Sequence, residues 1–465
     1  MHFLKKKIYD KLNRAREEIE TKSSELNDFV SVLEYRHLVR KGIEDNKEAE
    51  IWSDAFCAAL QEHEIVYIPE SDKPYYIDKS IIIPSNRRIE ADKNTVVRQM
   101  SGVRVLMLRN ENTMDGTKKP INGMNKDINI SVSGGRWEES HCHRAGYGQS
   151  GMYDEERSYF GVSACMFFNN MKNLSLKNMT FAHTAGFAVQ TGDIKNAVFE
   201  NIEFEECYAD GLHINGNTEN ITVRNIKGEV GDDLVALNMY DWQNSSVDFG
   251  AMRTVLCENL ELSSSSGYKA LRIEPGMYFF EDGSAVDCSA NDIIIKGVRG
   301  INTFKMYFQT PQYRIGEQPE KGGVGSGDNI FFEDIEIDLN APIDRFSEYL
   351  NSDPVKGSFA GFEIGANIEN IYFENINIKL YKEKYPMSFL ICAGPKSVRL
   401  GDMEVFDPYL SSTVGKIEMK NIRVNGAAKL NLTELVHEIK FCDINSDGKS
   451  TAEGKINMII HAVTL

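Results

Sequence analysis

A short phrase recurs along this chain, and it constrains the fold more than any other feature. Each copy has an asparagine, alternating aliphatic residues, a second asparagine and further aliphatic residues. Strand-like copies that recur about every 20–29 residues are typical of a solenoid, in which each repeat buries its apolar edge on its neighbours. We therefore expect an all-β chain that forms a parallel β-helix, with one coil per repeat. The clearest copies are NLSLKNMTF from Asn173, NAVFENIEF from Asn196, NITVRNIKG from Asn220, NIFFEDIEI from Asn329 and NIYFENINI from Asn370.

The second asparagine of the phrase, replaced by Gly or Asp in some copies, measures the length of each coil. Positions 178, 201 and 225 are 23 and 24 residues apart, which is about one bare coil, whereas later steps run from 34 to 46 residues. Insertions in repeat proteins tend to collect on one face, often the binding face. We expect such loops at 141–159, 240–250, 277–287, 311–327 and 342–357.

The N-terminal region has a different pattern. Apolar residues at positions 8, 12, 15, 19, 26, 30 and 33 follow helical spacing, so residues 1–43 are predicted to be a helical extension. This helix either packs on the end of the solenoid or joins copies of the chain into a homo-oligomer. A second helix is expected at 47–63, where it would cap the first coil. Residues 44–465 would then form the β-helix catalytic domain, with its long loops on the cleft face.

Composition excludes several functions. The formal net charge of the 465 residues is −17, which disfavours nucleic acid as a partner because phosphate contacts need a basic surface. The chain has no run of eighteen apolar residues and no apolar segment of a signal peptide, so we expect a cytoplasmic protein without a membrane span. Its eight cysteines are scattered without a Cys-x-x-Cys pair. We expect neither a metal nor another cofactor.

One strand of each coil can be aligned by its aliphatic residues. Because strand side chains alternate between faces, the polar residues between the aliphatic ones should point outward. Strands stack about 4.8 Å apart, so these polar residues should form columns that bind the substrate. One predicted column contains Gln190, His213, Arg272 and Tyr307, the next contains Asn215, Asn238, Glu274 and Gln309, and Lys269 and Lys305 lie beside them.

Three aspartates come just before two of these strands. Asp210 precedes one strand, and Asp232 and Asp233 precede the next. Asp-Gly and Gly-Asp-Asp are also ordinary turn sequences, which is the plainer interpretation. However, like charges held close together cost stability unless they are neutralised or used. Glycoside hydrolysis uses two such carboxyl groups, one protonated to donate to the leaving oxygen and one ionised to activate water or to attack. We expect Asp232 to lie across a water-sized gap from the other two.

These residues resemble glycoside hydrolase family 28, the polygalacturonases, within the pectin-lyase-like superfamily of right-handed parallel β-helices. Residues 208–211 are similar to the Asn-Thr-Asp-Gly element of the family, 231–233 to its Gly-Asp-Asp element and 134–138 to its Gly-Gly-x-x-Asp element. The resemblance covers roughly residues 65–430. It implies an inverting hydrolase in which Asp232 is the general acid and Asp210 and Asp233 position the water.

Two elements that bind the sugar carboxylate in the family are altered in this chain. The family Gly-His-Gly should follow one coil after Gly-Asp-Asp, where the sequence here is GYK at 267–269. The family Arg-Ile-Lys should fall near 304–307, where Lys305 takes the place of the Arg. His213 is placed to replace the missing His in part. These changes affect the identity of the sugar more than the hydrolysis.

We therefore predict a cytoplasmic glycoside hydrolase that cleaves a short oligosaccharide from a chain end by an inverting mechanism, with a uronic acid as one candidate sugar. Two alternatives stay open at this stage. One is a polysaccharide lyase or epimerase on the same scaffold, which needs a Lys, Arg or His base and often calcium. The other is a β-helix that binds a glycan without cleaving it.

Overall fold

The protein is described from a computed structural model. It covers residues 2–465 except for 114–124, 140–152, 155–156, 159–161, 163, 242–245, 264–265, 267–269, 281, 302–303, 308–321, 340–358, 381–386, 393–395, 401–402, 408–412, 426–428, 433–435, 442–443, 446–456 and 461–465. Among the described residues, none of the helices is long and apolar enough to cross a membrane.

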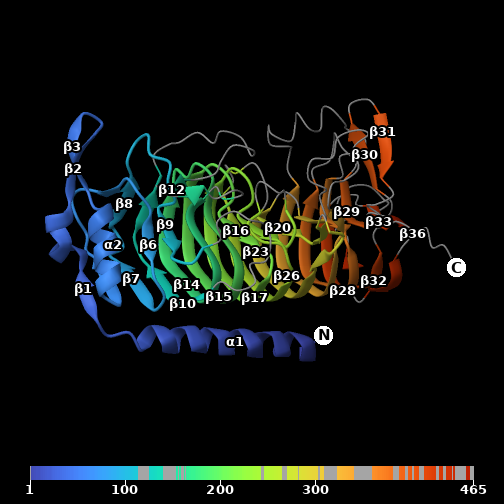
Figure 1. The fold of residues 1–465 in the computed structure, drawn as a ribbon. Helices are drawn as coiled ribbons and strands as arrows, with labels where there is room; N and C mark the ends of the chain where they lie inside the picture. Colours follow the sequence, from blue (N-terminus) through green and yellow to red (C-terminus); the bar gives the residue numbers. More distant parts are fainter. Residues whose placement is uncertain are drawn as a thin grey trace.

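The chain winds into a right-handed parallel β-helix, as the repeat predicts (Figure 1). One ladder of parallel strands contains the repeated phrase, and its members pair in register from coil to coil. Its strands are β1 (Phe29–Ser31), β4 (Ile65–Ile68), β7 (Arg87–Ala91), β10 (Asp127–Ser133), β14 (Ala164–Ala182), β15 (Phe187–Cys207), β17 (Thr218–Val230), β19 (Met252–Leu262), β23 (Ala290–Ile301), β26 (Ser326–Leu339), β28 (Asn367–Leu380), β32 (Val414–Asn425), β34 (Val436–Phe441) and β35 (Ile444–Asn445).

A second ladder of short strands carries the predicted site. It begins with β6 (Ile81–Ile83) and β9 (Leu108–Asn110), passes through the first residues of β14 and β15, and continues along the chain. Its later strands are β16 (Leu212–Asn215), β18 (Val235–Asn238), β20 (Leu271–Glu274), β24 (Phe304–Tyr307), β27 (Phe359–Gly365), β29 (Met387–Cys392), β33 (Lys429–Leu432) and β36 (Asn457–Ile460). A third, shorter ladder joins β5 (Tyr75–Ile77), β8 (Val96–Gln99) and β11 (Arg136–Glu138) to β14.

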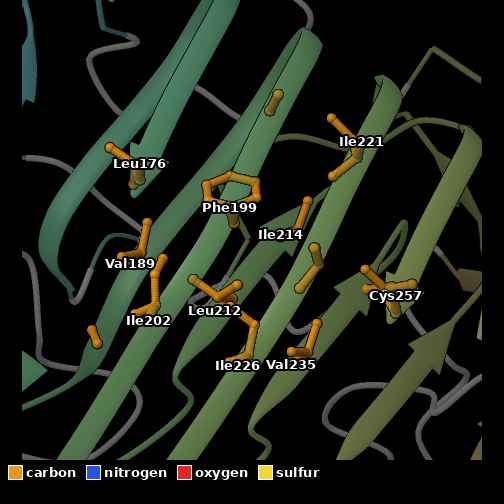
Figure 2. Close-up of a cluster of buried hydrophobic side chains, with 14 of the residues drawn as sticks. Leu176, Val189, Phe199, Ile202, Leu212, Ile214, Ile221, Ile226, Val235 and Cys257 are labelled. Atoms are coloured by element: carbon orange, nitrogen blue, oxygen red, sulfur yellow. The ribbon is translucent and has the colours of Figure 1, made fainter. Parts of the chain in front are cut away.

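Aliphatic side chains fill the interior of the coils, as alternation predicts (Figure 2). Val189, Leu212 and Val235 occupy equivalent positions on successive coils of the second ladder and are at most 1% exposed. Phe199 and Val223 fill the same layer from the first ladder. Burial of such a side chain stabilises the fold by about 1.5–3 kcal/mol, so the stacked interior supplies most of the stability.

Asparagine ladders hold the turns, which explains the repeated asparagines. Asn178, Asn201, Asn225 and Asn259 all have a left-handed backbone, with φ between 55° and 57°. The side-chain amide of each later residue donates to the carbonyl oxygen of the earlier one at 2.9–3.0 Å. Asparagine adopts this backbone more readily than most residues and also bonds along the stack, so both requirements of the turn are met at once.

The N-terminal helix α1 (His2–Ser24) lies along the side of the β-helix, not over its end as one prediction had it (Figure 1). Its buried face includes Ile8 and Leu12, which cover an apolar column of four outward side chains: Leu256, Ile294, Phe331 and Tyr372. A helix of this length spans about 34 Å, or about seven coil spacings. The homo-oligomer through this helix stays a prediction.

The helix is shorter than predicted, and the prediction of helix to residue 43 is wrong. After Ser24 the chain forms β1, the 3₁₀ helix η1 (Val32–Leu38) and a hairpin of β2 (Arg40–Glu44) and β3 (Lys47–Ile51). Asp45 and Asn46 both have positive φ, which is the conformation that a two-residue hairpin turn requires. The second predicted helix begins later than expected, because α2 covers Ser53–Glu62.

Other segments project from the coils. The predicted loop at 277–287 is a hairpin of β21 (Gly276–Phe279) and β22 (Ala285–Cys288), to which β25 (Gly322–Val324) adds a third strand. Two further small hairpins are formed by β12 (Tyr153–Asp154) with β13 (Arg157–Ser158), and by β30 (Lys396–Leu400) with β31 (Met403–Asp407). The predicted loop at 342–357 lies outside the described residues, as do most of 141–159 and of 311–327.

Candidate active site

The three predicted aspartates meet at the start of two neighbouring strands of the second ladder. Asp210 precedes β16, and Asp232 and Asp233 precede β18, the next coil. One carboxylate oxygen from each lies within 4.8 Å of the others. Asp210 and Asp233 are buried, whereas Asp232 is half-buried. The structure therefore brings together the acids that the sequence singled out, and it leaves Asp232 as the one most open to a ligand.

Glycines let the two turns approach closely. A Cβ atom at Gly231 would lie 2.1 Å from the carbonyl oxygen of Tyr208, and one at Gly211 would lie 2.6 Å from that of Leu234. The Asp210 carboxylate fixes the second turn, because its Oδ1 accepts a hydrogen bond from the Asp233 backbone N–H at 3.0 Å. Turn chemistry and the acid cluster are thus two consequences of one sequence pattern.

The first predicted column is correct over four coils and wrong on the fifth, and the second is correct over the three coils that can be compared. Gln190, His213, Ala236 and Arg272 are register partners, and so are Asn215, Asn238 and Glu274. On the next coil Arg272 pairs with Lys305, not with Tyr307 as predicted. The error is a shift of two residues, which keeps every side chain on its face and so leaves the alternation of apolar and polar residues unchanged.

Four predicted substrate-binding residues cannot be placed by their side chains. Lys269 and Gln309 lie outside the described residues, and only the backbone of Lys305 and Tyr307 is described.

His213 lies between two carboxylates. Its Nδ1 is 2.6 Å from Asp210 Oδ2, and its Nε2 is 3.1 Å from Asp241 Oδ2. Its ring stacks on Phe187 with 3.8 Å between centroids, and the side chain is 1% exposed. Burial alone would lower the pKa of His213, but the two carboxylates outweigh it and raise the pKa from 6.5 to about 9. The ring is therefore an imidazolium at neutral pH.

Asp241 is a member of the site that sequence reasoning missed. It lies in the 240–250 insertion, is 2% exposed, contacts His213 and accepts a hydrogen bond from Asn238 Nδ2 at 2.9 Å. The alignment of strands into columns did not find Asp241, because this residue follows the end of β18, where strand pairing no longer determines the position of a side chain. The available signal was its charge, three residues beyond Asn238 in a predicted loop on the cleft face.

Arg272 is surrounded by acids. Its guanidinium nitrogens lie 3.5 Å from Asp233 Oδ2 and 3.6 Å from Asp241 Oδ1, and it also forms a short ion pair with Glu274 Oε2. The residue is 8% exposed, and Glu274 is 1% exposed. Because a guanidinium has five donors in a fixed fork, one arginine can hold three carboxylates in place.

The polar columns are more deeply covered than a solvent-facing patch would be. Gln190 and Asn215 are fully buried; Gln190 Nε2 donates to Asn215 Oδ1 at 3.1 Å, and the Val247 backbone N–H donates to the same oxygen at 3.2 Å. Asn238 is also fully buried. Residues 240–241 and 246–250 of the insertion thus lie over this part of the ladder. We expect the three amides to support the loop and the charged groups, and not to contact a sugar directly.

The spacing of the acids bears on the predicted stereochemistry. Glycosidases that invert usually separate their two carboxyl groups by about 6.5–9.5 Å, and those that retain by about 5–5.5 Å. One oxygen of each of the three acids lies within 4.8 Å of the others, a distance that one bridging water can span, so the water-sized gap stays a prediction. Three carboxylates at this distance would also suit a divalent cation. The expectation of no metal therefore stays a prediction.

The fold and the acid cluster together define a parallel β-helix with a charged site on one face of its coils. No family model matches the chain, and no curated protein matches it. Solved structures do match. An exopolygalacturonase from Thermotoga maritima matches with a TM-score of 0.54 and 11% identity, over 93% of this chain and 96% of that one.

Two further structures give lower scores. A family 28 exopolygalacturonase from Yersinia enterocolitica matches with a TM-score of 0.47 and 12% identity, over 92% of this chain and 77% of that one. A polygalacturonase from Erwinia carotovora matches with 0.42 and 10%, over 87% and 95%. The resemblance that the sequence indicated is therefore found in the fold: this chain is a β-helix similar to that of the Thermotoga enzyme.

Proposed function

We propose that this protein is a glycoside hydrolase that cleaves an O-glycosidic bond with the acids of this cluster. The observation that carries the proposal is the convergence of Asp210, Asp232 and Asp233 from two consecutive coils, with Asp232 the most exposed. The likeness in fold to an exopolygalacturonase supports it, and so does the resemblance of the Gly-Asp-Asp element.

The contacts of each acid suggest its role. Asp232 is the general acid, because it is the member that a leaving oxygen can reach. Asp210 accepts a hydrogen bond from the Asp233 N–H and contacts His213 Nδ1, so its carboxylate is fixed in position. Asp233 is likewise held by Arg272 at 3.5 Å. An acid that donates and an ionised neighbour that activates water are the two groups that hydrolysis requires.

The stereochemical course separates two versions of this mechanism. Inversion is what the family resemblance implies, and it is our first choice, with water delivered by Asp210 and Asp233. Retention is the other course, and it would require one of the carboxylates to attack the anomeric carbon. We further propose action from the end of a short oligosaccharide, because the β21–β22 hairpin projects from the coil that carries Arg272 and Glu274.

A lyase or epimerase is the weaker alternative. Such chemistry needs a neutral Lys, Arg or His as a base. Among the described residues of the site, His213 is held protonated by two carboxylates and Arg272 by three. Neither is available to remove a proton at neutral pH, which favours hydrolysis.

A screen of short oligosaccharides tests the proposal. The set should cover neutral, amino, uronic and sulfated sugars in both anomeric linkages, and NMR should follow the anomeric proton of the first product. A saturated product with a new reducing end is expected. A product that absorbs in the ultraviolet, and that is no longer formed when calcium is chelated, would instead identify a lyase. Binding without any product across the whole set would identify a non-catalytic β-helix.

A further inference from the structure

Tyr208 is an exposed aromatic residue on the turn that leads to Asp210. Its side chain is 47% exposed, whereas the other tyrosines whose burial the structure describes are buried or half-buried. Within the described part of the chain, its side chain makes no hydrogen bond and no contact with another ring. Single exposed apolar residues are normal on protein surfaces, so exposure by itself assigns no role to Tyr208. Its position next to the acids does.

Hydrogen bonds between coils place Tyr208 beside the turn that carries Asp232. The Gly231 N–H donates to the Cys207 carbonyl oxygen at 2.8 Å, which pairs Gly231 with Tyr208. Asp232 follows Gly231 directly. Because paired strands lie about 4.8 Å apart, the backbone of Tyr208 is one coil spacing and one residue from the proposed general acid. Asp232 is half-buried and Tyr208 is exposed, so both side chains reach the solvent side of these two turns.

The neighbours of Tyr208 in the stack are too small to cover its ring. The Tyr208 N–H donates to the Thr184 carbonyl oxygen at 3.0 Å, which makes Ala185 its partner on the preceding coil. Its two partners are therefore an alanine and a glycine. The glycine is required by the backbone, because a Cβ atom at Gly231 would lie 2.1 Å from the Tyr208 carbonyl oxygen. Neither partner can cover a face of the aromatic ring, so the ring stays open to a ligand.

An open aromatic ring beside a glycosidase acid suits the chemistry of a sugar. One face of a pyranose ring presents C–H groups, and their partial positive charge is attracted to the negative face of an aromatic ring. A tyrosine side chain is rigid and amphipathic, so it supplies a large contact area at a low cost in conformational entropy. The hydroxyl groups at the edge of the sugar remain available for hydrogen bonds with polar groups of the site.

We infer that Tyr208 is a stacking platform for one sugar unit of the substrate, the unit that lies from Asp232 toward the N-terminal coils. The ligand class is an oligosaccharide whose units are pyranose rings with an accessible C–H face. This inference rests on the proposed function and deepens it, because it names a residue that binds the substrate without taking part in bond cleavage. The alignment of strands into columns did not include Tyr208, because the turn precedes the aligned strand β16.

Three variants test the platform with the best substrate of the oligosaccharide screen. Tyr208→Ala removes the ring, Tyr208→Phe keeps the ring and removes the hydroxyl group, and Phe3→Ala removes a 78% exposed ring from α1 as the matched control. We expect KM to rise about tenfold in Tyr208→Ala, the effect of roughly 1.4 kcal/mol, with kcat within about twofold of wild type. An interaction that is present in both the ground state and the transition state affects KM alone. Tyr208→Phe and Phe3→Ala should keep the wild-type KM.

Other outcomes separate this inference from the proposed function. An unchanged KM in Tyr208→Ala overturns the platform and leaves the hydrolase standing. An equal rise in Tyr208→Phe assigns the effect to the hydroxyl group, and an equal rise in Phe3→Ala assigns it to exposed rings in general; both overturn the platform. Because Tyr208 is exposed, the melting temperature of Tyr208→Ala should stay close to wild type. If it falls, Tyr208→Leu takes its place and should show the same rise in KM.

Binding measurements cover the case in which the wild-type protein cleaves no member of the set. The proposed function then fails, and isothermal titration calorimetry with the same oligosaccharides and variants replaces turnover. Binding that is about tenfold weaker in Tyr208→Ala alone supports the platform, whereas equal binding by all variants overturns it. Neither cleavage nor binding by the wild-type protein overturns both the platform and the hydrolase.

Discussion

Two outer faces of the same coils are each covered by another segment, and the two faces differ in how their acidic side chains are paired and buried. On one face α1 covers β14, β15, β17 and β19. On the other face, residues 240–241 and 246–250 cover β16 and β18. On the α1 face acids meet cations: Arg16 bonds both oxygens of Glu200 at 3.1 and 2.8 Å, and Lys5 bonds Glu333 at 2.5 Å. On the other face, which we call the acid face, five acids cluster. Asp232 is half-buried, and the other four are buried: Asp210, Asp233, Asp241 and Glu274.

This difference indicates that the α1 face serves to stabilise the fold, whereas the face with the acid cluster is the one that we propose acts on a substrate. Ion pairs that are partly exposed, such as those of α1, contribute about 0.2–1 kcal/mol each. The apolar contact made by Ile8 and Leu12 therefore stabilises that face more than these ion pairs do. Buried charges are different, because removing an ion from water costs several kcal/mol before any pairing offsets it. Stability alone therefore does not explain why five acidic side chains cluster on one face.

The largest expected effect is a loss of activity on the acid face. Asp232→Asn cannot donate the proton and should lower kcat by about 10³-fold or more, with little change in melting temperature because Asp232 is half-buried. Glu200→Gln, which alters an acid on the α1 face, should leave kcat unchanged. Turnover by Asp232→Asn within tenfold of wild type would remove this residue as the acid.

The next effect belongs to the α1 face and should alter stability alone. Leu12 is 3% exposed in the contact between α1 and the outward apolar column, so Leu12→Ala should lower the free energy of unfolding by about 2–5 kcal/mol. Asn13→Ala, at an exposed position of the same helix, is the control. Urea denaturation measures both, and equal midpoints for the two variants would show that α1 does not hold the coils.

The acid face should give a pH dependence of stability that the α1 face lacks. The pKa of His213 is raised from 6.5 to about 9 in the folded state. A raised pKa stabilises the fold fully below the unfolded value, and this contribution is lost as the pH rises from about 6.5 to about 9. The shift corresponds to roughly 3 kcal/mol. Melting temperature measured across this range should fall for wild type and stay flatter for His213→Gln; parallel curves would contradict this assignment.

The smallest effect is expected in the turns that belong to neither face. Asn201→Ala removes two amide hydrogen bonds and puts at φ 56° a residue that adopts the left-handed backbone less readily than asparagine, which should cost about 1–2 kcal/mol. Asn201→Gly removes the same bonds but accepts this backbone without strain, so it should be less destabilising. Thermal melting distinguishes the two, and an alanine variant as stable as the glycine variant would show that strain plays no part.

Several features could be predicted from the sequence because they depend on neighbours along the chain or on the repeat. Alternation placed the interior residues, the asparagines marked the left-handed turns, and a fixed coil length brought Asp210 beside Asp233. The β2–β3 hairpin was also predictable, because Asp45-Asn46 is a hairpin turn sequence; the helical spacing of apolar residues on either side concealed it.

Other features required the folded chain. An outward column of Leu256, Ile294, Phe331 and Tyr372 breaks the expected polar exterior, but the sequence does not say that α1 is what covers it. Asp241 reaches His213 from an insertion, and the two-residue shift at Lys305 follows pairing that the apolar pattern cannot distinguish.

The sequence by itself determined the β-helix and the meeting of three aspartates, because a repeat of nearly constant length stacks equivalent residues one strand apart. Only the tertiary structure decided which charges neutralise which, how deeply the acids are buried and where the N-terminal helix lies. Those properties depend on contacts between segments far apart in the chain, where no periodic pattern fixes the distance.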